Sequence, residues 1–175
     1  MKYDAARSLE ILTRTPAVLR AMLGGVSQEW THANYGADTF SPFDVVGHLI
    51  HGEKTDWIVR THWIREKGPS EPFPPYDRFA QLRDSRGKTL AMLLEEFESL
   101  RRKNLDELSS LRLGERDLDL PGLHGKLGAV TQRQLLATWV VHDLNHIAQI
   151  AKALAFQYKD EVGAWREFLP ILPRA

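Results

Sequence analysis

Four long stretches of this chain carry apolar residues at the spacing of an amphipathic helix, and this pattern limits the fold more than any other feature. They cover about residues 3–22, 41–67, 88–111 and 131–157. Residues three and four positions apart share one helix face, so each stretch would bury one side against its neighbours. No strand alternation and no internal repeat appears. The sequence therefore predicts an all-α fold, a four-helix bundle formed by one domain that spans residues 1–175.

Two long connections separate these helices. Residues 68–75 contain four prolines, and residues 114–130 are rich in glycine. Proline removes a backbone donor and crowds the preceding helical turn, so neither segment can continue a helix. We expect long crossover connections here, short helices at about residues 76–85 and 162–168, and a kink at Pro16.

Two of the predicted helices begin with capping signals. Ser41 precedes Pro42 and stands three residues before Asp44, and Thr131 stands three residues before Gln134. In a capping box the hydroxyl accepts the N–H of the third helical residue, whose side chain reaches back to the cap. The second helix should therefore start at Pro42 and the fourth just after Thr131.

Composition narrows the classes of function. Lysine plus arginine and aspartate plus glutamate are balanced at 23 each, which argues against a nucleic-acid or anionic-membrane partner and favours a small-molecule substrate. The chain has no cysteine, so histidine and carboxylate must supply any metal ligands. The N-terminal residues lack the apolar core of a signal peptide, and no apolar run reaches the ~20 residues of a membrane span. We expect a soluble cytoplasmic protein.

Three histidines are the candidate metal ligands. His142 and His146 lie one helical turn apart, so both rings can point toward one ion. A third ligand must come from another helix, and helical phase places His48 toward the apolar side of the second helix and His51 toward the polar side. His62 is too far along that helix to share the ion. The competing interpretation is a set of packed histidines without a metal.

Buried charges form the second candidate feature of the site. Glu53, Asp56, Arg60 and Asp143 fall within the apolar arcs of their helices and must therefore be paired. A metal-bound imidazole usually donates its second N–H to a carboxylate or carbonyl group, so Asp143 or Glu53 could support a ligand in this way, with Arg60 balancing the charge. An interhelical salt bridge with no role at the site is the alternative.

Three segments together resemble the DinB superfamily, including its DinB-like and YfiT-like metalloenzymes. They are the run from His48 to Glu53, the run from Gly128 to Leu136, and the run from His142 to Ile150. The resemblance implies a bundle with up-down-down-up connectivity, a divalent metal bound by His48, His142 and His146, and frequent homodimers. It also implies relatives that transfer low-molecular-weight thiols, although many members of the family have no known activity.

These observations lead to one main hypothesis and two alternatives. The main hypothesis is a metal-dependent enzyme of the S-transferase type that activates a low-molecular-weight thiol, since the chain has no cysteine nucleophile of its own. A metal-hydroxide hydrolase and a non-catalytic metal-binding stress-response protein are the alternatives. Three histidines with an open position suit zinc or nickel best, and iron or manganese could also bind. The sequence does not identify a catalytic acid or base.

Overall fold

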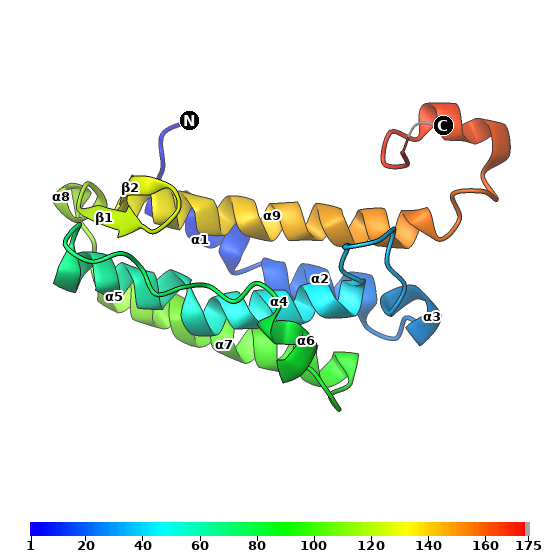
Figure 1. The fold of residues 1–175 in the computed structure, drawn as a ribbon, viewed down its shortest axis with the longest axis horizontal. Coiled ribbons are helices and arrows are strands. Elements are labelled where there is room, and N and C mark those ends of the chain that lie inside the picture. The colour runs from blue at the N-terminus through cyan, green and yellow to red at the C-terminus, as the bar shows by residue number, and fades with distance from the viewer. Residues whose placement is uncertain (174–175) are drawn as a thin grey trace.

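The computed structural model describes residues 1–173 and confirms the four-helix bundle (Figure 1). Each of the first two bundle positions is occupied by two consecutive helices, and each of the last two by one long helix. The bundle helices are α1 (Ala5–Leu12) with α2 (Thr15–Leu23), α4 (Pro42–Thr55) with α5 (Trp57–Lys67), α7 (Leu90–Ser110) and α9 (Gln132–Phe156).

The helices follow the up-down-down-up order. In Figure 1, α1–α2 and α9 run in one direction, and α4–α5 and α7 both run in the other. Because α4–α5 and α7 are parallel, the chain between them must return along the whole bundle. The proline-rich connection makes this return and places its residues over α4 and α5.

Both predicted caps are present. The hydroxyl of Ser41 accepts a hydrogen bond from the backbone N–H of Asp44, whose carboxylate accepts from the Ser41 N–H at 3.1 Å. Thr131 and Gln134 form the same reciprocal pair at the start of α9. These local bonds fix where the two ligand-bearing helices begin.

Two of the predicted helices are interrupted in the structure, the first of them close to the kink expected at Pro16. The first break lies at Thr13 and Arg14, before Pro16, because proline has no N–H to donate to the carbonyl of Leu12. The second is a single non-helical residue, Asp56, with φ −113° and ψ −81°. Backbone hydrogen bonds continue on both sides of Asp56, so the spacing of the apolar residues is not interrupted there. The break therefore leaves no mark in the sequence pattern.

One short β-hairpin, which no sequence pattern indicates, lies within the second long connection of this helical fold. Strand β1 (Pro121–His124) pairs antiparallel with β2 (Gly128–Thr131), and Leu123 also accepts a backbone hydrogen bond from Phe73 of the crossover at 2.9 Å. Four-residue strands are too short to show an alternating pattern, and this hairpin forms through pairing and packing at the end of the bundle.

Short elements complete the described part of the chain. They are α3 (Gln28–Thr31), α6 (Ala80–Asp84), α8 (Glu115–Leu118) and a 3-10 helix, η1 (Gly163–Phe168). The α6 and η1 segments agree with the two short helices expected there. The segment that contains η1 leaves the end of α9 and extends away from the bundle (Figure 1).

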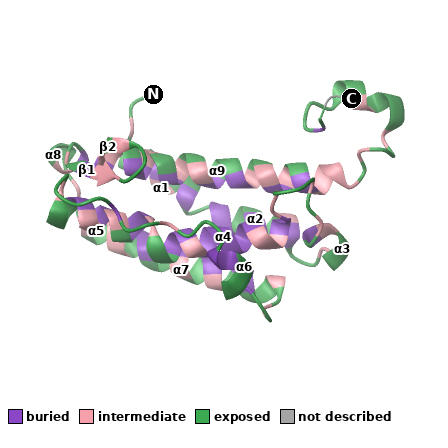
Figure 2. Cartoon of the chain, in the orientation of Figure 1, coloured by how far each residue is buried: buried purple, intermediate pink, exposed green. Residues whose placement is uncertain are grey.

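Two apolar clusters fill the bundle along its length (Figure 2). One surrounds Trp57 and Trp139 near the hairpin end, and the other surrounds Val46, Phe97 and Ile150 near the α3 end. The predicted histidine site lies on α4 and α9, between these regions. Among the residues that the structure describes, no helix is both long and apolar enough to cross a bilayer.

Candidate metal centre

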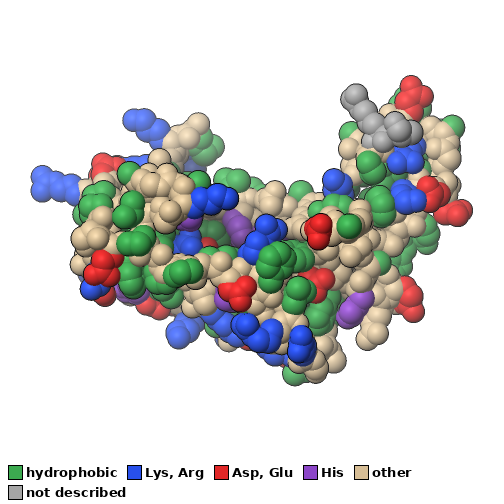
Figure 3. Space-filling model, viewed as in Figure 1, with side chains coloured by type: hydrophobic (Ala, Val, Ile, Leu, Met, Phe, Trp, Pro, Cys, Tyr) green, Lys and Arg blue, Asp and Glu red, His purple; other side chains and the backbone are tan. Residues whose placement is uncertain are grey.

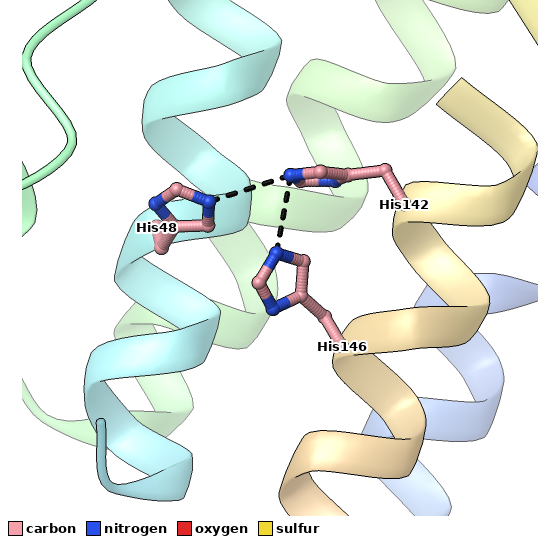
Figure 4. Close-up of side chains that lie close together, drawn as sticks. All are labelled: His48, His142 and His146. Carbon is pink, nitrogen blue, oxygen red and sulfur yellow. Dashed lines mark hydrogen bonds between the residues drawn. The ribbon is translucent and has the colours of Figure 1, made fainter. Parts of the chain in front are cut away.

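The structure brings His48, His142 and His146 together between α4 and α9 (Figure 4). Nε2 of His142 lies 3.3 Å from Nε2 of His48 and 3.1 Å from Nε2 of His146. One ligand atom from each ring lies within 4.8 Å of those of the other two. The one-turn spacing on α9 produces the shorter distance, whereas the longer one depends on how α4 packs against α9.

Hydrogen bonds on the outer nitrogens orient two of the rings. Nδ1 of His146 lies 2.7 Å from Oε1 of Gln149, and Nδ1 of His48 lies 3.5 Å from the hydroxyl of Tyr76. An amide oxygen only accepts, so Nδ1 of His146 carries the hydrogen and Nε2 keeps its lone pair. Nδ1 of His142 is buried and has no hydrogen-bond partner in the described part of the chain.

Burial keeps the three rings neutral at pH 7. Desolvation, followed by the neighbouring His146 and other positive groups, lowers the pKa of His48 to about 4. Desolvation and the other two histidines lower the pKa of His142 to about 2. The pKa of His146 is also lowered, mainly by burial. A neutral imidazole is the form that binds a metal ion, so the site does not have to lose protons first.

Aromatic side chains pack against the rings of His48 and His142. The indole of Trp57 meets His142 edge-on at 5.0 Å between ring centroids, and Phe40 and Tyr76 lie about the His48 ring at 6.0 and 5.9 Å. Figure 3 shows histidine side chains in a hollow between α9 and the α4–α5 row, with lysine and arginine side chains at its edges. The hollow on this face is therefore the side from which the site can be reached.

Two of the three nitrogen separations match those around a shared divalent ion. With metal–nitrogen bonds of about 2.1 Å, separations of 3.1 and 3.3 Å correspond to angles of about 95° and about 104° at the ion. These angles lie between octahedral and tetrahedral values. Without a cation, His142 Nε2 would face two other ring nitrogens but could carry only one hydrogen. These two separations and the all-nitrogen donor set therefore favour a metal ion over a hydrogen-bonded histidine cluster.

The expected support of a ligand by Asp143 or Glu53 needs correction. Both carboxylates are buried, and both accept hydrogen bonds from Arg101 of α7, at 2.6–2.9 Å for Asp143 and 2.8–3.1 Å for Glu53. Neither bonds to a histidine ring in the part of the chain that the structure describes. Arg60 does not balance them either, because it pairs with Asp56 at 2.9 Å. The interhelical salt bridge is the alternative that the structure contains.

Three residues around the site were not predicted from the sequence: Arg101, Tyr76 and Gln149. Arg101 lies four residues after Phe97 and four before Leu105, both buried, so its position on the apolar stripe of α7 indicates a buried charge. Gln149 lies one turn after His146 on the same face. Tyr76 offered no such signal, because only the path of the crossover brings it to His48.

The remaining candidate histidines lie outside the cluster. His51 is partly exposed and packs against the Tyr76 ring at 4.9 Å, while its neighbour His48 turns inward. His62 on α5 lies 2.7 Å from a carboxylate oxygen of Glu107. Helical phase predicts the difference between His48 and His51, and the distance along the helix predicts that His62 lies away from the cluster.

Comparison with known proteins then identifies the family. The model of the DinB superfamily matches residues 11–150, which include all three histidines. The chain belongs to the DinB superfamily. A DinB-like solved structure, YfiT from Bacillus subtilis, has 20% sequence identity and a TM-score of 0.72, and the match covers 93% of this chain and 94% of YfiT. YfiT is described as a probable metal-dependent hydrolase with an unusual four-helix bundle topology, and the likeness confirms the same fold here. A comparison with curated proteins gives no match.

Proposed function

We propose that His48, His142 and His146 bind one divalent metal ion and that the protein is a metal-dependent enzyme. The convergence of three neutral Nε2 atoms, at 3.1 and 3.3 Å, supports this proposal most directly. Zinc or nickel is the expected ion, with iron or manganese as alternatives. Three protein ligands are typical of catalytic sites, which keep a coordination position open for water or substrate.

The bound ion would lower the pKa of a water or thiol at that open position. The chain's own groups would orient the ligands and limit access of bulk water. Gln149 holds the His146 ring in the tautomer that leaves Nε2 free. If His48 binds through Nε2, its Nδ1–H faces the Tyr76 oxygen, and the phenol hydrogen is then free for another acceptor. Burial raises the pKa of Tyr76, so this phenol keeps its hydrogen at neutral pH.

For the reaction, we propose that a low-molecular-weight thiol attacks an electrophilic substrate in an S-transferase reaction. The lack of cysteine supports an external nucleophile. Glu53 and Asp143, the buried carboxylates nearest in sequence to the ligands, are both occupied by Arg101. A thiol that is already ionised at the site needs no carboxylate base, which agrees with this arrangement.

Hydrolysis is the second candidate, and the description of YfiT as a probable metal-dependent hydrolase favours it. It requires only water at the open position. A non-catalytic metal-binding role is the third candidate, and it predicts a bound ion without turnover of any substrate.

Metal binding can be tested by titrating the metal-free protein with zinc or nickel. We expect one ion per chain, and at least a tenfold weaker affinity in His48→Ala and in His142→Ala, since each removes a ligand. His51→Ala is the matched control, because His51 lies on the same helix with its ring outside the cluster. Equal affinities for His48→Ala and His51→Ala would contradict the proposed ligand set.

The reaction can be tested with an electrophile such as monochlorobimane and several small thiols. We expect loss of the electrophile that depends on both thiol and metal and is abolished in His142→Ala. Turnover of ester or amide substrates without thiol would instead support the hydrolase. A metal-loaded protein inactive in both assays would favour the non-catalytic role.

A further inference from the structure

The guanidinium of Arg101 is enclosed at the centre of the bundle, and each of its five N–H groups has an acceptor. The side chain is 1% exposed. Nε and Nη2 donate to Oε1 of Glu53 at 3.1 and 2.8 Å, and Nη1 and Nη2 donate to the two Asp143 oxygens at 2.6 and 2.9 Å. The fifth hydrogen bond goes from Nη1 to the carbonyl of Leu12 at 2.9 Å. The donor capacity of an arginine is therefore fully used.

Arg101 is on α7, and its three acceptor residues lie on the other three positions of the bundle. Leu12 ends α1, Glu53 is on α4 and Asp143 is on α9. The carbonyl of Leu12 is available because Pro16, four residues later, has no N–H to donate to it. The helix break at Pro16 thus supplies one of the acceptors, and a single side chain connects all four positions of the bundle.

Neighbouring groups hold this contact in place without replacing it. The guanidinium carbon lies 4.9 Å from the centre of the Phe97 ring and 5.1 Å from that of Trp139. Asn104 and Trp139 also donate to Glu53, at 2.9 and 3.2 Å. Neither of these two side chains contacts Asp143 or Leu12 through a hydrogen bond in the described residues. Trp139 thus joins α9 to α4 by one hydrogen bond, whereas Arg101 joins Glu53 to Asp143 through four.

Both carboxylates are close in sequence to the candidate ligands. Asp143 follows His142 directly, and Glu53 lies five residues after His48 on the same helix. Fixing Glu53 relative to Asp143 therefore fixes the helix that carries His48 relative to the helix that carries His142. We propose that Arg101 is a positioning residue that sets the distance between His48 and the histidine pair of α9. This inference rests on the proposed metal site and extends it to a residue whose hydrogen bonds go to none of the ligands.

The proposal distinguishes two parts of the site. The 3.1 Å spacing of His142 and His146 is local to α9 and should not depend on Arg101. The 3.3 Å spacing of His48 and His142 crosses between helices and should depend on it. Lysine in place of Arg101 would keep the charge but provide three donors from one atom, which cannot bridge two carboxylates and a carbonyl in the same geometry.

The test compares Arg101→Lys with Arg60→Lys. Arg60 is also largely buried and paired with a carboxylate, but its partner Asp56 is one turn away in the chain, so it joins no two bundle positions. Cobalt(II) serves as the probe, because its absorption spectrum reports coordination geometry as well as binding. We expect Arg101→Lys to weaken cobalt affinity by roughly 10–100-fold and to alter the spectrum, as is typical when support of metal ligands is lost, and Arg60→Lys to change neither.

A second measurement needs no metal. Because the chain has no cysteine, spin labels can be placed at Thr55→Cys and Thr138→Cys, two exposed positions at the end of α4 and on α9. Pulsed electron paramagnetic resonance then gives the distance distribution between the helices. We expect a narrow distribution in the protein that keeps Arg101 and a broadened or shifted one in the Arg101→Lys variant, again without change in Arg60→Lys.

Folding of each variant is checked by circular dichroism and cooperative unfolding. If Arg101→Lys does not fold, Asp143→Asn provides the second variant, because it weakens only the α9 side of the contact and should give the same two changes. A folded variant with the distance distribution and cobalt affinity of the parent protein would overturn the proposal. Failure of the parent protein to bind cobalt would contradict the proposed function instead. The distance measurement by itself would then test whether Arg101 positions the helices.

Discussion

Lowering the pH from 7 to 5 should destabilise the metal-free protein through His142. The pKa of this histidine falls from 6.5 in the unfolded chain to about 2 in the folded protein. Below pH 6.5 the unfolded state therefore binds a proton that the folded state does not, and stability falls as the pH decreases. At about 1.36 kcal/mol per pH unit over roughly 1.5 units, His142 should cost about 2 kcal/mol of unfolding free energy at pH 5.

Other buried groups contribute over the same pH range. His48, with a folded pKa of about 4, acts in the same direction as His142. Burial raises the pKa of Asp56 to about 6 and also raises that of Glu53, so protonation of these carboxylates on acidification stabilises the folded state. The total change is thus a difference between opposing contributions, and a variant is needed to isolate that of His142.

The measurement is urea unfolding, followed by circular dichroism, of chelator-treated protein at both pH values. In His142→Gln, the loss of stability between pH 7 and pH 5 should be smaller than in the parent protein by about 2 kcal/mol. His124→Gln is the control, because His124 lies at the hairpin and is partly exposed, so solvent screens its charge. Equal losses in His142→Gln and the parent protein would refute the burial argument, and with it the neutral state proposed for this ligand.

Three further predictions concern the bundle. Gly47→Ala would place a Cβ 2.5 Å from the Ser85 hydroxyl, so thermal unfolding should show a loss of about 1–3 kcal/mol, whereas Gly125→Ala, with open space around it, should have little effect. Ser41→Ala removes the capping box of α4 and should reduce the free energy of unfolding by about 1 kcal/mol in urea, and a change below experimental error would contradict the role of this cap. The homodimer expected from the family stays a prediction, and light scattering coupled to gel filtration should give twice the monomer mass; a monomer at micromolar concentration would contradict it.

Much of the site could be predicted because it depends on helical phase. The one-turn spacing of His142 and His146 is a local property of α9, and the apolar period of α4 distinguishes His48 from His51. Buried charge could be predicted as well, since Glu53 and Asp143 fall within apolar arcs. Their partner could not, because helical phase shows that a charge is buried but not which helix faces it. Arg60 was the expected partner because it lies on the same predicted helix as Glu53. The actual partner of Glu53 is Arg101 of α7.

The sequence by itself determined the four amphipathic helices, their caps and the inward face of each candidate ligand. These features depend on residues within a few positions of one another, whose side-chain directions follow from helix geometry. Tertiary structure alone decided that the Nε2 atoms of His48 and His142 lie 3.3 Å apart, that Tyr76 reaches His48, and that Arg101 joins the bundle positions. These contacts join residues that are 28 or more positions apart, and their distances are set by how whole helices pack.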